Sequence, residues 1–171
     1  MHLPKNVVVV ASAGNDGPDS GTVLNVAPWL FTVAASTIDR DFTSTLTLGN
    51  NDNYMGASLF GNLPSQKSFT LISSTDAKLP NATFQDAQFC KPATLDPAKV
   101  NGSVVICVRE GKIRSVVEGQ EALSAGAYGM VLSNNNQSGN TVLAEPHVLS
   151  TTNTVNQEFE PNIHEYYNST K

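Results

Sequence analysis

The sequence predicts an α/β fold built on parallel strands. One observation is the run of four valines at residues 7–10, which is followed by small residues and then by a Gly-Asn-Asp-Gly-Pro turn. This pattern is typical of a strand that is buried on both faces and ends abruptly. The other observation is a strand, a helix and a returning strand between residues 104 and 133, the unit from which parallel sheets are built.

Composition narrows the class of protein. The 171 residues, 40% of them hydrophobic, suffice for one domain or for a domain with part of another. Ten basic and fifteen acidic residues give a net charge of −5, which argues against nucleic acid or an anionic membrane as a partner. No apolar run approaches the roughly 20 residues that span a bilayer, so we expect no membrane segment.

Asn15 is the polar side chain that we expect to meet a ligand beyond the first strand. Open α/β sheets bind their ligands past the carboxyl ends of their strands. An asparagine amide donates hydrogen bonds and cannot become charged, which suits it to stabilising an oxyanion. The alternative is that Asn15 only forms the turn, and spacing alone favours that alternative.

The next elements are predicted from patterning as far as residue 60. A polar loop over residues 19–27 would line a cleft, and residues 29–35 form a second strand. We expect a two-stranded ribbon from about residue 30 to 60, because residues 42–48 alternate apolar and polar side chains before a turn at residues 49–53.

A change of composition places a domain boundary near residue 60. Residues 61–89 are rich in Asn, Ser, Pro and Lys, which suits a connector and short edge strands. Residues 104–108 and 129–133 are predicted as buried strands.

Two helices are predicted in this second part. The first begins with a capping box from Ser115 to Glu118 and ends near Gly126. Its inward residues are expected to be Val116, Gly119, Leu123 and Ala125, and its outward residues Glu118, Gln120, Glu121 and Ser124. A closing helix with Pro161 in its first turn is expected from the helical spacing of Phe159, Ile163, Tyr166 and Tyr167.

The motif around Asn15 closely resembles that of plant subtilisin-like serine proteases. Residues 12–18 read Ser-Ala-Gly-Asn-Asp-Gly-Pro, residues 21–23 read Gly-Thr-Val, and residues 25–37 read Asn-Val-Ala-Pro-Trp-Leu-Phe-Thr-Val-Ala-Ala-Ser-Thr. The match covers more than twenty positions. It implies that Asn15 is the oxyanion-hole asparagine and that Ser12, Ala13 and Gly14 belong to the substrate cleft.

The second part resembles the protease-associated (PA) domain of the same family. The strand-helix-strand unit is preceded by Cys-Lys-Pro at residues 90–92 and followed by Ala-Glu-Pro-His-Val-Leu at residues 144–149. The resemblance implies that residues 1–60 are a partial catalytic domain with a parallel-sheet segment. Residues 61–171 would be a PA domain, a mixed sheet or open barrel flanked by helices.

The resemblance implies a serine endopeptidase, but this segment alone is expected to be inactive. The family's Asp and His motifs precede this stretch and its Ser motif follows it, and none of them occurs here. The expected partners are a peptide or protein substrate, the rest of the catalytic domain, and proteins that contact the PA domain. No cofactor is expected. An apparent signal peptide at residues 1–14 is rejected, because its removal would delete a core strand.

The three histidines, His2, His147 and His164, have neither a triad spacing nor a metal-binding spacing. We interpret them as surface or packing residues and expect no metal site. Glu110 stands where many members of the family carry glycine, and the sequence does not assign it a role.

The cysteines and the glycosylation sequons indicate the cellular compartment in which the protein is expected. By number alone, Cys90 and Cys107 could equally be two buried thiols or a disulfide, and the resemblance implies that they pair. Four sequons could carry glycans, at Asn81, Asn101, Asn136 and Asn168. Together with the resemblance, these features predict an extracellular protein of the apoplast or cell wall, or a vacuolar one.

The sequence is compatible with two other classes of function. The chain could be a non-catalytic PA-type module for protein contacts, and protease motifs in the flanking coding sequence would exclude this. Nucleotide binding at Gly14, Gly17 and Gly21 is the weaker alternative, because the glycines do not follow the dinucleotide or phosphate-loop spacing.

Overall fold

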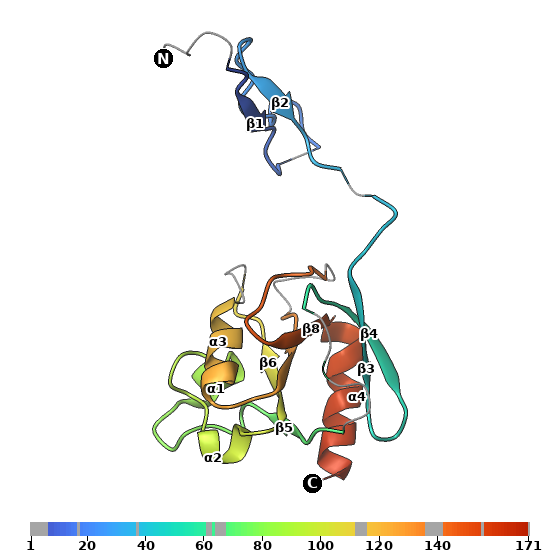
Figure 1. Cartoon of the computed structure of the whole chain (residues 1–171), viewed down its shortest axis with the longest axis vertical. Helices are drawn as coiled ribbons and strands as arrows, with labels where there is room; N and C mark the ends of the chain where they lie inside the picture. Colours follow the sequence, from blue (N-terminus) through green and yellow to red (C-terminus); the bar gives the residue numbers. More distant parts are fainter. Residues whose placement is uncertain are drawn as a thin grey trace. The chain divides into compact units, whose positions relative to one another are not determined.

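The structure is a computed structural model of the chain. It describes all residues except 1–6, 17, 37, 61–62, 64–67, 112–115, 136–141, 155 and 171, and only the backbone of residues 156–160. The chain forms two compact units, Met1–Arg40 and Asp41–Lys171, here called unit 1 and unit 2 (Figure 1).

Unit 1 is a pair of short parallel strands, β1 (Val10–Ser12) and β2 (Phe31–Val33). The expected burial of the first strand on both faces is wrong for this unit, since Val8 is 77% exposed and Val10 63% exposed. Among the described residues, β1 pairs with β2 alone, and the valine side chains remain exposed. The second predicted strand is confirmed in a shorter form.

Unit 2 is built on one mixed six-stranded sheet. Its strands are β3 (Thr43–Thr47), β4 (Asn53–Ala57), β5 (Leu71–Ser73), β6 (Val104–Val108), β7 (Gly129–Ser133) and β8 (Ser150–Thr154). Their order across the sheet is β3-β4-β8-β7-β6-β5. The strands β5, β6, β7 and β8 run parallel to one another. The ribbon of β3 and β4 is antiparallel, and β4 joins the sheet by pairing antiparallel with β8. The edge position of β5 agrees with the expectation for residues 61–89.

Two apolar clusters occupy opposite faces of this sheet. Alternate side chains of β6 and β7, including Val105 and Met130, pack in the larger cluster with residues of the helices α2 (Pro97–Val100) and α3 (Val116–Ser124) and with Cys90, which follows the short helix α1 (Phe84–Gln88). The intervening residues Ile106 and Val131 face α4 (Asn156–Ser169), whose Ile163 is fully buried. The alternation follows from the pleat of the strands, and it explains why both strands are almost wholly apolar.

The β3–β4 ribbon is confirmed, and in this structure it groups with unit 2. Its turn is closed by the Leu48 N–H, which donates to the Asp52 carbonyl at 2.9 Å. Leu46 and Tyr54 pack on the cluster around Ile163, so the units divide after Arg40 rather than near residue 60. The assignment of residues 41–60 to a catalytic domain stays a prediction.

The predicted helices α3 and α4 are present, with different details. Ser115, the expected cap of α3, lies outside the described residues. α4 begins at Asn156, so Pro161 lies inside the helix rather than in its first turn. Ile163 and Tyr167 are buried as the spacing predicts, and the side chain of Phe159 lies outside the described residues.

The two short helices α1 and α2 were not predicted, although each has a recognisable start signal. Thr83 caps α1 by accepting a hydrogen bond from the Asp86 N–H at 3.0 Å. Asp96 caps α2 in the same way through the Ala98 N–H at 3.0 Å, and Pro97 occupies the first turn. Ser, Thr or Asp before a helix and Pro at its first position are favoured, so these signals could have found both helices.

Hydrogen exchange should differ sharply between the two units. We expect the amides of β1 to exchange much faster than those of β6 in the 171-residue chain, because β1 has one partner strand and exposed side chains, whereas Val105 is fully buried. Exchange followed by mass spectrometry or NMR measures both. Equal protection of the two strands would contradict this expectation.

Candidate functional site

Asn15 lies just past the carboxyl end of β1, and its side chain is exposed. It follows Gly14, whose φ of +92° lies in the region that favours glycine. A Cβ on Gly14 would also meet the Leu24 side chain at 3.1 Å. Ser12 is exposed, while Ala13 and Gly14 are half-buried. The backbone therefore turns sharply just before Asn15 and presents its amide to solvent.

The loop that carries Asn15 is fastened at its base by hydrogen bonds. The Ala13 N–H donates to the Val33 carbonyl at 3.0 Å, and the Ala13 carbonyl accepts from the Leu24 N–H at 2.8 Å. The Asn25 side-chain amide donates to the Ser12 carbonyl at 2.8 Å. The two residues before Gly14 are thus held from both β2 and the returning end of the loop.

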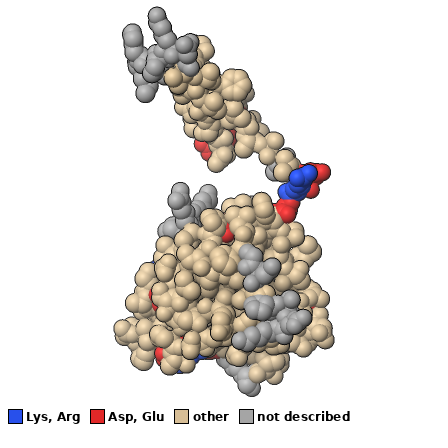
Figure 2. Space-filling view, in the orientation of Figure 1, with Lys and Arg blue, Asp and Glu red and all other residues tan. Residues whose placement is uncertain are grey.

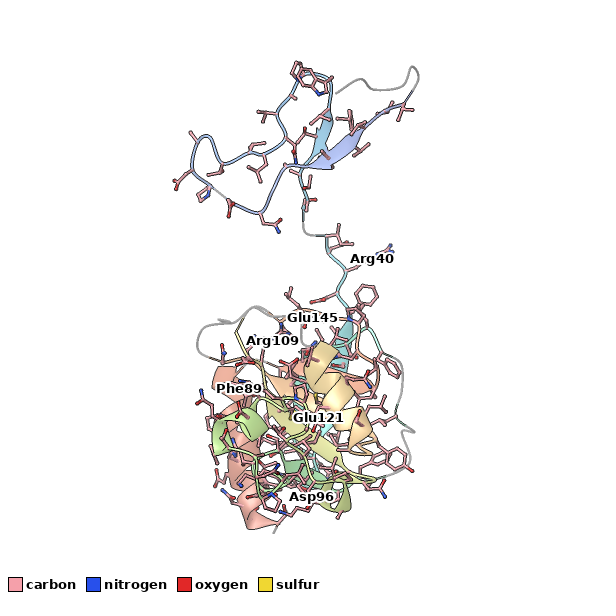
Figure 3. All side chains as sticks on the ribbon, turned by 90° about the vertical axis from the view of Figure 1, so that its left-hand side faces the viewer. Arg40, Phe89, Asp96, Arg109, Glu121 and Glu145 are labelled. Atoms are coloured by element: carbon pink, nitrogen blue, oxygen red, sulfur yellow. A yellow bond between two sulfur atoms is a disulfide. The ribbon has the colours of Figure 1, made fainter. Side chains whose placement is uncertain are left out.

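A second set of functional groups, buried and charged, lies in unit 2. Arg109 follows β6 and forms a bidentate ion pair with Glu145 (Figure 3). The distance from Nη2 to Oε2 is 2.7 Å, and that from Nη1 to Oε1 is 3.3 Å. Glu118 of α3 and His147 are also buried, at 5% and 8% exposure, and both interact electrostatically with Arg109 and Glu145.

The expectation that Glu118 faces water is therefore wrong, as is the expectation that Leu123 points inward, because Leu123 is 43% exposed. The face of α3 that packs on the sheet is made of small residues, so the helix approaches closely. At Gly119 an added Cβ would lie 3.1 Å from Nδ1 of His147. Glu118 directly precedes Gly119 on the helix, and its side chain is buried as well.

Burial shifts the pKa values of these two groups in opposite directions. Burial raises the pKa of Glu118, and backbone hydrogen bonds and the Arg109 charge offset only part of that rise. Burial lowers the pKa of His147, although the nearby Glu145 charge favours the protonated form. Oε2 of Glu118 has no hydrogen-bond partner among the described residues, and His147 has only the nearby side chain of Asn153, which favours the protonated form too weakly to offset burial. Both groups are thus held toward their neutral forms.

Glu121, a further acidic residue of α3 that was expected to face water, is half-buried and organises a neighbouring loop. Its Oε1 accepts from the backbone N–H groups of Thr94 and Leu95 at 2.9 and 3.0 Å, and its Oε2 accepts from that of Ala93 at 2.9 Å. Ala93 has a φ of 61°, a strained value for a residue other than glycine. The carboxylate therefore holds a turn that alanine alone would not favour.

Glu110, to which the sequence gives no role, joins a surface ion-pair network. Lys91 Nζ lies 2.9 Å from Glu110 and 3.0 Å from Asp86. The hydrogen bonds that its ammonium donates to Glu110 and Asp86 raise the pKa of Lys91. The pKa of Asp86 is lowered mainly by the hydrogen bond that the Thr83 hydroxyl donates to it. The contact with Lys91 lowers it further. The network lies beside Cys90 in the sequence.

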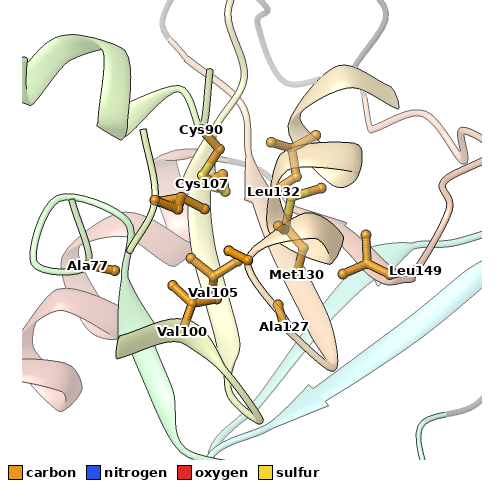
Figure 4. Packing of buried hydrophobic residues seen from close by; sticks show 12 residues of the cluster. Ala77, Cys90, Val100, Val105, Cys107, Ala127, Met130, Leu132 and Leu149 are labelled. Carbon is orange, nitrogen blue, oxygen red and sulfur yellow. A yellow bond between two sulfur atoms is a disulfide. The ribbon is translucent and has the colours of Figure 1, made fainter. Parts of the chain in front are cut away.

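The disulfide between Cys90 and Cys107 is confirmed. Cys107 lies in β6, Cys90 follows α1, and both are fully buried with their Cα atoms 5.8 Å apart. Figure 4 shows the pair within the larger apolar cluster, next to Val105. The bond therefore ties the connector that precedes α2 to β6, the second strand from the β5 edge of the sheet.

The remaining residues singled out from the sequence, the sequon asparagines and the other histidines, do not lie together in one site. Asn81, Asn101 and Asn168 are exposed, whereas Asn136 lies outside the described residues. His164 is exposed on α4, and His2 lies outside the described residues. An open polar hollow of about 690 Å³ is lined in part by Asp52 and Glu165.

Within the described residues, no three His, Cys, Asp or Glu side chains lie together as metal ligands, and no helix is long and apolar enough to cross a membrane. On the face of unit 2 seen in Figure 2, acidic residues appear as separate spots among uncharged ones.

Comparison with known proteins shows which family the region that contains β6 and β7 resembles. A family model described as the PA domain matches residues 68–165. A subtilisin-like protease of Glycine max, Glyma18g48580, is 65% identical over 152 residues, which are 89% of this chain and 19% of the relative. SBT5.4, a subtilisin-like protease of Arabidopsis thaliana, is 48% identical over 87% of this chain and 19% of its own length. A protein from the same plant named CO(2)-response secreted protease is 36% identical over 99% of this chain and 22% of its own length. The chain thus spans about a fifth of the relatives that it matches.

Loss of the disulfide should destabilise unit 2 substantially. Because the paired cysteines are separated by 17 positions in the sequence, we expect replacement of both by alanine to lower the free energy of unfolding by about 3 kcal/mol. Urea unfolding followed by far-UV circular dichroism measures the difference. A loss below about 0.5 kcal/mol would mean that the bond does not constrain the unfolded chain.

Glu118 and His147 should give opposite pH dependences of stability. The unfolded chain protonates His147 more readily than the folded chain, so this residue lowers the free energy of unfolding as the pH falls below 6.5. Folded Glu118 holds its proton to a higher pH than unfolded Glu118, so its penalty declines as the pH falls from its raised pKa toward 4.5.

The matched variants His147→Gln and Glu118→Gln isolate the two effects. Between about pH 4.5 and 6.5, the wild type should become less stable relative to His147→Gln and more stable relative to Glu118→Gln as the pH falls. Urea unfolding at several pH values tests this. Differences that do not vary with pH would show that neither group is shifted.

Proposed function

The chain belongs to the PA-domain family, and from this premise we propose that it is the part of a plant-type subtilisin-like serine endopeptidase that carries the oxyanion-hole asparagine and the PA domain. In this proposal residues 1–60 contribute a parallel-sheet segment and a ribbon to the catalytic domain. Residues 61–171 form the PA domain. The observation that carries the catalytic assignment is the exposed amide of Asn15 at the end of a strand whose backbone is fastened on both sides.

Asn15 would act on the tetrahedral intermediate of peptide-bond hydrolysis. When a serine oxygen attacks the peptide carbonyl, the carbonyl oxygen becomes an oxyanion and must be stabilised. The Asn15 side-chain N–H can donate to that oxygen and, being uncharged, takes no part in proton transfer. Ser12, Ala13 and Gly14 would line the cleft that holds the substrate on the same side.

The exposed apolar side chains of unit 1 support association with further elements of a catalytic domain. Val8, Val10, Trp29 and Phe31 are each more than 60% exposed. Side chains of this kind on a two-stranded sheet gain free energy when a second layer or further strands cover them. We expect the rest of the catalytic domain to do so.

The proposed location is outside the cytoplasm, in the apoplast, the cell wall or the vacuole. A buried disulfide is typical of an oxidising compartment, and three of the four sequons have exposed asparagines. We propose glycosylation at Asn81, Asn101, Asn136 and Asn168. One relative bears the name of a secreted protease, which supports the same location.

The PA domain is proposed to contact other proteins. Val117 and Leu123 of α3 and the nearby Tyr128 are exposed, with 43% to 52% of their surface accessible. If the intact protein proves to have no protease activity, such contacts become its principal function.

In the intact protease, Asn15→Ala should lower turnover far more than substrate binding. The amide meets the oxygen fully only once that oxygen is negative, so the hydrogen bond belongs to the transition state. We expect kcat to fall about 100- to 1,000-fold with KM little changed, the loss typical when subtilisin loses an oxyanion-hole asparagine.

Two further variants sharpen this experiment. Asn15→Asp should be at least as harmful, because a carboxylate cannot donate and repels the oxyanion. Asn162→Ala, on the exposed side of α4, is the control and should retain kcat. A raised KM with unchanged kcat for Asn15→Ala would assign Asn15 to substrate binding or to the turn.

A further inference from the structure

We propose that Asn25 is a positioning residue for Asn15, and that its side chain holds the base of the loop on which Asn15 is carried. This inference rests on the proposed role of Asn15 in the oxyanion hole. It comes from the hydrogen bonds within unit 1 and concerns a residue outside the cleft-lining stretch of residues 12–14.

The backbone of Asn25 has an unusual conformation. Its φ is 59°, and it is the only residue other than glycine in the described part of unit 1 with a left-handed φ. Glycine adopts this region without steric cost, whereas asparagine tolerates it. The side chain of Asn25 makes a contact that glycine could not, since its Nδ2 donates to the Ser12 carbonyl at 2.8 Å.

Asn25 is itself tied to β2. The Thr32 hydroxyl in that strand donates to the Asn25 carbonyl. Asn25 therefore links β2 to the last residue of β1 through two hydrogen bonds in series. The neighbouring bond from the Leu24 N–H to the Ala13 carbonyl, at 2.8 Å, closes the loop one position further along.

These bonds determine where the chain leaves β1. The carbonyls of Ser12 and Ala13 both accept from the returning end of the loop, and the Ala13 N–H donates to Val33. Asn15 follows two residues later, after the left-handed turn at Gly14. Loss of the Asn25 amide would free the Ser12 carbonyl and let the end of β1 rotate, which would move the Asn15 amide.

Such a movement should affect turnover and not substrate affinity. Oxyanion stabilisation depends on a donor that is already in place when charge develops, and displacements of about 1 Å can cost large factors in rate. Because the Asn15 bond forms in the transition state, its misplacement lowers kcat and leaves KM nearly unchanged.

Two variants of Asn25 separate its side chain from its backbone. Asn25→Gly keeps the left-handed φ and removes the amide. Asn25→Asp keeps the shape and replaces the donor by an acceptor that faces the Ser12 carbonyl. We expect both to lower kcat of the full-length protease about 10-fold with KM changed less than about 2-fold. Asn51→Gly is the matched control, because Asn51 is a left-handed asparagine, φ 69°, in the β3–β4 turn, and kcat should not change.

A double-mutant cycle with Asn15→Ala distinguishes positioning from a general effect. If Asn25 acts through Asn15, then Asn25→Gly has no further effect on kcat once Asn15 is alanine. An equal loss in both backgrounds, or no loss in either, would overturn the role of Asn25 while leaving that of Asn15 intact. A wild-type kcat in Asn15→Ala would instead remove the proposed function on which this inference depends.

The 171-residue chain gives a readout that is independent of catalysis. Asn25→Gly should raise the hydrogen-exchange rate of the Leu24 amide, whose bond to Ala13 lies next to the lost contact. The Asn51→Gly variant should leave that rate unchanged. Unchanged exchange at Leu24 in Asn25→Gly would show that the side chain does not hold the loop, and would overturn the proposal.

Discussion

The parallel pairing of β6 with β7 is the contact on which the rest of unit 2 depends. Five consecutive residue pairs, from Val104 opposite Gly129 to Val108 opposite Ser133, place alternating side chains on both faces of the sheet. One face packs with α2, α3 and the disulfide, and the other packs with α4 and the ribbon. A shift of one residue would exchange the faces and place each side chain against the wrong partners, so the register is strongly determined.

The close approach of α3 to this sheet explains why charged groups are buried beside it. Gly119 and Ala122 let the helix lie near the strands, and a longer side chain at position 119 would collide with His147. The space next to these small residues is occupied by Glu118, His147 and the pair of Arg109 with Glu145. A buried ion pair costs desolvation, and removing one partner leaves the other uncompensated. The tight helix packing thus explains why burial raises the pKa of Glu118 and lowers that of His147.

The sequence predicts the centre of unit 2 well and its periphery less well. The strands β6 and β7 follow from unbroken apolar runs, because burial on both faces leaves no room for polar alternation. The periodicity of α3 correctly predicts Gly119 and Ala125 as inward-facing. It misplaces Leu123, because the close contact selects small residues such as Ala122 and leaves the larger Leu123 outside. The ribbon was recognised, but its packing against α4 depends on contacts between Gly49 and Tyr166, 117 positions apart, which no local pattern reveals.

The segment around Asn15 differs from the rest of the chain because its contacts are close in sequence. Ser12 is tied to Asn25, 13 positions away, and Ala13 to Leu24 and Val33 in the same unit. A motif with such contacts carries its own local geometry, which is why a short stretch of sequence could indicate both a strand end and an exposed amide. Oxyanion stabilisation by that amide depends also on the position of the attacking atom. That position is determined by residues far away in the sequence. The local geometry can therefore be intact in the isolated chain even where the chemistry requires the whole enzyme, and the two can be measured separately.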